Sequence, residues 1–278
     1  NEYDRAEIWF KRGLGYAREQ NHTVELIRAH LGYGRLCTEL GRIKGARTHL
    51  NRGSRLAWKD GPPSLAAEAQ HDLCAFLISR GHFGEAEDRA RRALRWYPKN
   101  HPRLPFFAAD VALLFVFQRN FLAAARILKL VSKMVDQPGP RAVVLALFAR
   151  ALAGAGFEYE AESRRRRALR LLDKNPAVES WTRWHLADSE RLARKWDIAE
   201  QEARRAIEAA EEQNDRETEV HARRLLAAIT AREIAPPGPP RTDAQFRELV
   251  VNLRTRITRW SRQRARQHRP PWGMDWAA

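Results

Sequence analysis

A pattern of small residues that returns every 37 to 40 positions constrains this 278-residue chain more than any other feature of its sequence. Five segments have a small residue at their centre: Ala46, Ala86, Ala124, Ala161 and Ala199. Seven positions after these stand Gly53, Ala93, Val131, Ala168 and Ala206, and twelve positions before them stand Gly34, Cys74, Ala112, Ala149 and Ala187. A period of this length is typical of repeat proteins, in which each repeat packs mainly against its neighbours.

The offsets within each segment predict two antiparallel helices per repeat, joined by a short turn. Small residues at a crossing let two helix backbones approach to about 8–10 Å. Gly41, Gly81 and Gly156 follow the expected first helices, where a residue in the left-handed conformation often ends a helix. Pro98 and Pro176 follow second helices, which they cannot continue. Since no long alternating run and no Asn-Gly turn predicts a strand, the sequence predicts an all-α fold.

This pattern resembles the tetratricopeptide repeat (TPR). The second repeat carries the resemblance at Leu73, Cys74, Leu77, Gly81, Ala86, Ala90, Ala93, Leu94 and Pro98. The fourth repeat carries it at Phe148, Ala149, Leu152, Gly156, Tyr159, Ala161, Ala168 and Leu169. The repeats exceed the family norm of about 34 residues, as longer TPR variants do, and Arg165 stands where an apolar residue is usual. The resemblance implies a right-handed α-solenoid, a TPR-like superhelix of about five and a half helix pairs over residues 1–234.

The two ends of the chain depart from the regular repeat. Residues 2–20 fit the second helix of a repeat whose first helix is missing, and the chain does not begin with methionine. We therefore expect a piece of a longer protein, with a lone capping helix as the alternative. One more helix is expected over residues 216–234.

A second unit is expected after the repeats. Residues 235–241, Ala-Pro-Pro-Gly-Pro-Pro-Arg, cannot be helical and are expected to form a linker. Thr242 and Gln245 then form a capping-box pattern that opens a basic amphipathic helix over residues 242–269. Its apolar stripe consists of Phe246, Leu249, Val250, Leu253, Ile257 and Trp260. Residues 270–278 are expected to form an extended tail.

The resemblance also implies a binding groove, because the first helix of each TPR pair lines the concave face of the superhelix. The predicted partner-binding residues are Arg35, Glu39, His71, Ser79, Phe106, Leu113, Phe117, Arg150, Trp181, Trp184, Asp188 and Arg191. The segment 106–117 is apolar except for Asp110, which indicates either burial on both sides or docking of an apolar ligand. Trp181 and Trp184 share a helix face and belong either to the core or to a partner site. The carboxylate clamp of chaperone-binding TPR domains is not expected, because Leu31 and Arg35 stand at the matching positions.

The formal net charge of +16 suggests an anionic partner. The predicted anion- or nucleic-acid-binding residues lie in the C-terminal helix, where no acid stands between Glu248 and Asp275: Arg254, Arg256, Arg259, Arg262, Arg264, Arg266 and Arg269. Arginine suits phosphate because its planar guanidinium donates two parallel hydrogen bonds. The alternative is a solvated face of a packed helix in a chain that is rich in arginine throughout. The run 164–167 points around its helix and is not expected to form one patch.

The sequence gives little support for catalysis. It contains no HExxH, Walker, GxSxG or paired CxxC motif, so we expect no enzyme, no metal site and no cofactor. Cys37 and Cys74 fall in helix-packing positions and give no disulfide scaffold. No apolar run is long enough to span a bilayer and no secretory leader opens the chain, so a cytoplasmic location is expected.

These features together predict a non-enzymatic TPR scaffold or adaptor. It would bind a peptide or protein partner in its concave groove and dock through its basic C-terminal helix. One alternative is the peptide-sensing half of a transcriptional regulator whose DNA-binding domain lies upstream. Another is a nucleic-acid-binding subunit that uses the arginine-rich C-terminal helix, for which an acidic protein would be an equivalent partner.

Overall fold

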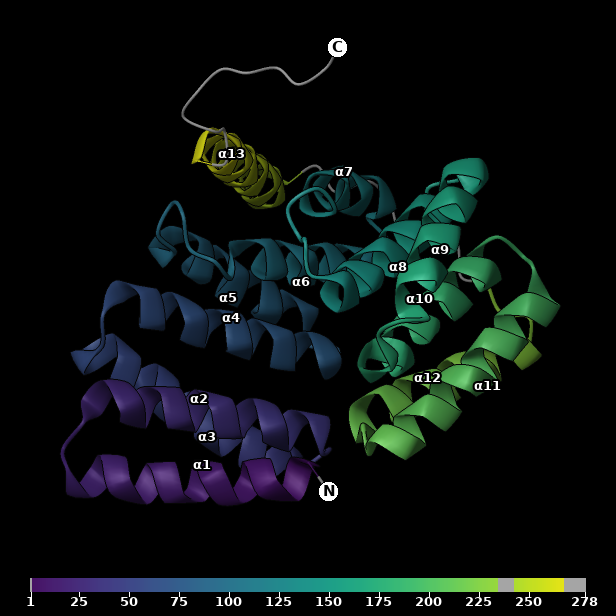
Figure 1. Cartoon of the computed structure of the whole chain (residues 1–278). Helices are drawn as coiled ribbons and strands as arrows, with labels where there is room; N and C mark the ends of the chain where they lie inside the picture. The colour runs from purple at the N-terminus through teal and green to yellow at the C-terminus, as the bar shows by residue number, and fades with distance from the viewer. Residues whose placement is uncertain (1, 235–242, 268–278) are drawn as a thin grey trace, which may run out of the picture.

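The structure is a computed structural model that describes residues 2–234 and 243–267. These residues form α-helices, one short 3-10 helix and no strand (Figure 1). The helices of the repeats are α1 (Glu2–Glu19), α2 (Thr23–Glu39), α3 (Ile43–Asp60), α4 (Pro63–Ser79), α5 (Phe83–Trp96), α6 (Leu104–Phe117), α7 (Phe121–Val131), α8 (Pro138–Gly154), α9 (Glu158–Leu172), η1 (Pro176–Val178), α10 (Glu179–Leu192), α11 (Trp196–Gln213) and α12 (Arg216–Thr230). The last helix is α13 (Ala244–Gln267). Within the described ranges, no helix combines the length and the apolar composition that crossing a membrane requires.

The helices pack as the repeat pattern predicts. Contacts join α2 to α3, α4 to α5, α6 to α7, α8 to α9 and α10 to α11, while α1 packs on α2 and α12 packs on α11. Figure 1 shows α1–α5 on one side of the molecule, α8–α12 along the other side and α13 beside α7. The expectation of an all-helical, repeat-like fold is therefore confirmed.

The small residues of the pattern are all buried, which explains their spacing. The central alanines, from Ala46 to Ala199, expose at most 5% of their surface. A Cβ atom added at Gly34 would lie 2.6 Å from Leu50 Cδ2, and one added at Gly53 would lie 2.8 Å from Leu31 Cδ2. At Gly34 and Gly53 the pattern thus marks positions where no larger side chain fits between neighbouring helices.

The first helices end as the glycines predict. Gly41, Gly81 and Gly156 have φ angles of +66°, +77° and +84°, in the left-handed region. The end of α12 differs from the prediction, because the helix stops at Thr230 rather than at Ile234. Arg232 adopts a φ of +51° there, which turns the chain out of the helix.

We expect Gly81→Ala to lower the free energy of unfolding by about 1–2 kcal/mol, the cost of a left-handed conformation for a residue with a Cβ atom. Nothing lies within 4 Å of the added Cβ, so the substitution tests the backbone alone. Gly84 in α5 is the matched control, since its Cβ would also meet nothing. Gly84→Ala should leave the stability unchanged or raise it by up to about 1 kcal/mol. Urea denaturation measures both, and equal losses for the two variants would contradict the interpretation.

α13 packs on α6 and α7 through its apolar stripe. Its members Phe246, Leu249, Leu253 and Ile257 are buried. Asp243 caps the helix, since its Oδ1 accepts a hydrogen bond from the Phe246 backbone N–H at 2.8 Å. Thr242, the predicted cap, lies outside the described residues, as do the expected linker 235–241, the expected tail 270–278 and residues 268–269 of the expected helix.

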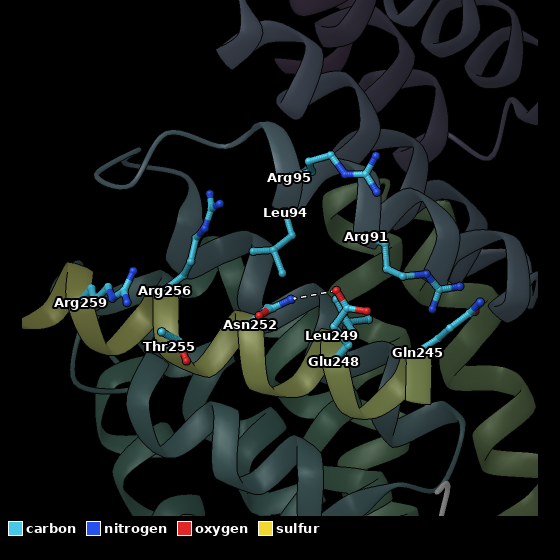
Figure 2. Close-up of a pocket in the computed structure, with 10 residues that line it drawn as sticks. All are labelled: Arg91, Leu94, Arg95, Gln245, Glu248, Leu249, Asn252, Thr255, Arg256 and Arg259. Carbon is cyan, nitrogen blue, oxygen red and sulfur yellow. Dashed lines mark hydrogen bonds between the residues drawn. The ribbon is translucent and has the colours of Figure 1, made fainter. Parts of the chain in front are cut away.

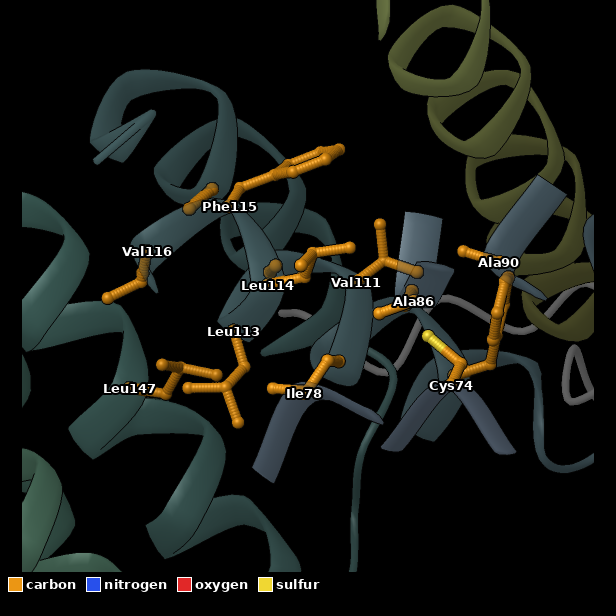
Figure 3. Close-up of a cluster of buried hydrophobic side chains, with 14 of the residues drawn as sticks. Cys74, Ile78, Ala86, Ala90, Val111, Leu113, Leu114, Phe115, Val116 and Leu147 are labelled. Atoms are coloured by element: carbon orange, nitrogen blue, oxygen red, sulfur yellow. The ribbon is translucent and has the colours of Figure 1, made fainter. Parts of the chain in front are cut away.

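The apolar helix α6 is covered on more than one side. The Phe115 ring packs against Phe246 of α13, with 4.9 Å between the ring centres. Leu113 points in a different direction, beside Ile78 and Leu147 (Figure 3), and it also lines a cavity. Phe106, near the start of the helix, is 38% exposed, so α6 is buried along most of its length but leaves apolar surface open at Phe106.

Candidate functional site

Two adjoining cavities lie where α2, α4, α6, α10 and α12 converge. The first has a volume of about 400 Å³ and is lined by Arg35, Glu39, His71, Ser79, Phe106, Leu113, Phe117, Trp181 and Trp184, among others. The second, of about 450 Å³, shares Ser79, Phe117 and Trp184 with the first and adds Arg150, Asp188 and Arg191. We call the two cavities together the central groove. Every predicted groove residue lines it, and their role in binding stays a prediction.

The contribution of α12 to the groove was not predicted from the sequence. Glu217 and His221 from this helix line the central groove, and so do Asp72, Arg103 and Asp110. The repeat period was the signal that could have found His221, because it stands 37 positions after Trp184. α12 takes the place of the first helix of a sixth pair and closes the groove against α2.

A buried carboxylate organises the charges at one end of the groove. Asp72 Oδ2 lies 2.6 Å from Arg35 Nη1, and Asp72 Oδ1 lies 2.7 Å from Arg103 Nη2. Arg103 Nη1 also lies 2.8 Å from Glu68 Oε2. Burial opposes the charge on Arg103, but Asp72 outweighs it and raises the pKa of Arg103. Asp72 therefore holds Arg35, which is exposed, in a fixed position at the mouth of the groove.

His71 links three elements beneath the groove. Its Nδ1 lies 2.8 Å from the Tyr97 hydroxyl and its Nε2 lies 2.7 Å from Asp110 Oδ2. The side chain is buried. With both ring nitrogens occupied, His71 positions α4, α5 and α6 relative to one another rather than offering a group to a ligand.

Aromatic rings and a buried ion pair form the other end of the groove. The guanidinium of Arg150 lies 5.0 Å from the centre of the Phe117 ring and 5.1 Å from that of Trp184. Its Nε forms an ion pair with Asp188, which also pairs with Arg191 Nη2 at 2.6 Å. Burial would raise the pKa of Asp188, but the two guanidiniums lower it.

The two tryptophans of α10 divide between the two roles foreseen for them. Trp184 is buried, and the His221 ring stacks on it with 5.1 Å between centres. Trp181 is partly exposed and meets Trp184 edge to face at 5.3 Å. Trp184 thus belongs to the core, whereas Trp181 offers apolar surface to the groove.

Two carboxylic acids lie where α12 approaches α2 and α4. Burial raises the pKa of Glu39 to about 7, and Asp215 adds to the rise. Burial also raises the pKa of Glu217 to about 7, although the Ser79 hydroxyl and Arg80 act against it. Arg80 Nη2 lies 3.8 Å from Glu217 Oε1. Both acids therefore change charge near neutral pH.

The predicted anion-binding arginines of α13 separate into two groups. Arg254, Arg259 and Arg262 are exposed. Arg256 donates a hydrogen bond to the Tyr97 carbonyl, and Arg264 lies 2.5 Å from Asp136 Oδ2. These two arginines hold α13 against the repeats. The side chain of Arg266 and all of Arg269 lie outside the described residues.

A separate cavity of about 620 Å³ lies between α5 and α13, and we call it the α5–α13 cavity. Figure 2 shows Arg91 and Arg95 of α5 on one side of it and Arg256 and Arg259 of α13 on the other. In the described part of the chain, no cluster of three or more His, Cys, Asp or Glu could hold a metal ion. Cys37 and Cys74 are buried and form no disulfide.

Comparison with known proteins bears on the fold alone. No family model matches the sequence, and no curated protein matches it. The crystal structure of BtubC (BKLC) from P. vanneervenii is similar, with a TM-score of 0.55 and 16% sequence identity over 88% of this chain and 97% of that chain. At this identity the likeness concerns the path of the backbone. It supports an all-helical, repeat-like fold for this chain.

Proposed function

We propose that this chain is a non-enzymatic scaffold that binds a peptide, or a helix of a protein partner, in the central groove. We assign the repeats to a right-handed, TPR-like superhelix. One observation supports the proposal above all: each of the predicted groove residues lines one or both of the two cavities that form the groove. The two cysteines without a disulfide agree with a reducing compartment such as the cytoplasm.

The lining of the groove favours a ligand with both apolar and polar groups. Phe106, which is 38% exposed, and the partly exposed Phe117 and Trp181 offer apolar and aromatic surface. Arg35, whose side chain is 46% exposed, is held by Asp72 and keeps N–H groups for peptide carbonyl or carboxylate oxygens. Cavities of several hundred Å³ suit a few side chains of a bound segment.

Peptides selected on the full chain from a random displayed library test this proposal. We expect Trp181→Ala to weaken the selected peptides by about 10- to 30-fold, because buried aromatic anchors dominate such interfaces. Fluorescence polarisation with a labelled peptide gives the dissociation constants.

Trp58→Ala is the matched control, since Trp58 is exposed on α3 and does not line the central groove. It should leave peptide affinity unchanged. Peptides that bind Trp181→Ala and the wild type equally would place the binding site elsewhere, and a selection that yields no specific peptide would contradict the proposal.

A further inference from the structure

Two exposed tryptophans from successive repeats meet on a surface that the central groove does not use. Trp58 at the end of α3 is 66% exposed, and Trp96 at the end of α5 is 38% exposed. Their rings meet edge to face, with 5.5 Å between centres and 86° between planes. The repeats do not need this pair for their core, because the small residues and leucines of α3 and α5 fill that role. A pair of large aromatic side chains left in solvent indicates a binding surface.

Arginines surround these two rings. A cavity of about 470 Å³ at this place is lined by Ser54, Arg55, Trp58, Gln70, Arg89, Arg92, Arg95 and Trp96. Arg55 precedes Trp58 by three positions and Arg92 precedes Trp96 by four, so each helix presents arginine and tryptophan on one face. None of the described residues that line this cavity is an acid. Among the residues that the structure describes, no carboxylate forms an ion pair with Arg55, Arg92 or Arg95.

The basic surface continues onto α13. Arg95 lines both the tryptophan cavity and the α5–α13 cavity, and it lies across the latter from Arg256 and Arg259 (Figure 2). Arg91 is paired with Glu87 and Asp88, and Glu248 is the acid on this surface. We call the continuous surface the Arg–Trp strip; its members are Arg55, Trp58, Arg89, Arg92, Arg95, Trp96, Arg256 and Arg259. Docking of α13 thus extends a basic surface that α3 and α5 begin.

We propose that the Arg–Trp strip binds single-stranded nucleic acid. Guanidinium groups donate paired hydrogen bonds to phosphate oxygens, and the exposed indole of Trp58 offers a face on which an unpaired base stacks. A duplex would leave the tryptophans unused, because its bases are already stacked on one another. An acidic peptide would use the arginines but not the rings. The presence of arginines around a pair of exposed tryptophans therefore favours a strand that carries phosphates and free bases together.

Fluorescence anisotropy of the full chain with labelled single strands of about 15 nucleotides, RNA and DNA, tests the proposal. Trp58→Ala and Trp96→Ala should each weaken binding by about 5- to 100-fold through lost stacking. Trp58→Phe should retain most of the affinity, because it keeps an aromatic face. The double variant Arg92→Gln/Arg95→Gln should weaken binding and make the plot of log K against log salt shallower by about 0.7 for each lost phosphate contact.

The chain offers matched controls. Trp9 on α1 is 67% exposed and has Arg12 over its ring at 5.9 Å, so Trp9→Ala removes a similar pair from another surface. Arg205→Gln removes an exposed arginine from α11. Both variants should bind like the wild type, and circular dichroism should show all variants folded.

Several results would overturn the proposal. One is the absence of binding in about 50 mM salt, where phosphate contacts are strong. Another is wild-type affinity in both tryptophan variants, or equal competition by a duplex, either of which would reduce the strip to general attraction of phosphate. The last experiment measures binding of the same variants to vesicles that contain phosphatidylserine. If they bind in a tryptophan-dependent way while the oligonucleotides do not, the strip is a membrane-binding surface.

Discussion

Asp188→Ala should lower the free energy of unfolding by about 3–5 kcal/mol, which is the usual cost of leaving one partner of a buried ion pair alone. The Asp188 carboxylate pairs with Arg150 and Arg191 under the aromatic end of the central groove. Arg150 is buried, and its other polar neighbour is His185 Nδ1 at 3.3 Å. Burial lowers the pKa of His185 and Arg150 adds to the effect, so the ring is neutral; an imidazole in any case supplies no negative charge in place of the carboxylate. Urea denaturation followed by circular dichroism measures the loss.

Two further variants separate the ion pair from general damage. Asp88 also pairs with an arginine, Arg91, at 2.6 Å, but its side chain is 62% exposed. Asp88→Ala should therefore cost at most about 1 kcal/mol. Adding Arg150→Met to Asp188→Ala should recover most of the stability, because an apolar side chain often replaces a buried charge at little cost. Equal losses for Asp88→Ala and Asp188→Ala would show that Arg150 needs no buried counter-charge.

The helices and their crossings were predictable from the sequence because both depend on short-range patterns. A period set by small residues, such as Ala46 and Ala86, reports where backbones approach. Left-handed helix ends appear directly as glycines, Gly81 among them. After α6 and α10 the left-handed residues are Arg119 and Arg194, which have positive φ angles but cannot be recognised from the sequence as glycines can.

For the central groove, the sequence predicted only which residues lie on the same face of the repeats. The repeat register assigned Arg150 and Asp188 to the groove, but it could not show that they would pair beneath its surface. Contacts between residues far apart in the sequence could not be predicted, because no local sequence pattern indicates them. Examples are the approach of Glu217 to Arg80 and the placement of Arg95 opposite Arg256, each of which depends on the curvature that many helix crossings produce together.

Glu217→Gln should make the protein more stable than the wild type by about 3 kcal/mol at pH 8, while the two proteins should be about equally stable near pH 4. Burial raises the pKa of the Glu217 carboxyl from 4.5 to about 7 in the folded protein. Between these values the folded chain holds a proton that the unfolded chain has released, so this group costs stability as the pH rises through 7. The amide of glutamine carries no charge at either pH and escapes this cost. Urea denaturation of both proteins at a series of pH values gives the difference.

The comparison with the wild type matters because other groups titrate in the same interval. Burial and, to a smaller extent, nearby arginines together lower the pKa of His221, beside Glu217, to about 4. This histidine makes the stability of both proteins rise from about pH 4 to 6.5.

Glu219 on the same helix is the control. Burial opposes the charge on Glu219, but Arg216 and Arg223 together outweigh it and lower its pKa, so its contribution is already constant between pH 6 and 8. Glu219→Gln should then show no gain over the wild type as the pH passes 7. A gain as large as that of Glu217→Gln would mean that the effect comes from the reduced negative charge of α12 rather than from the burial of Glu217 beside Arg80.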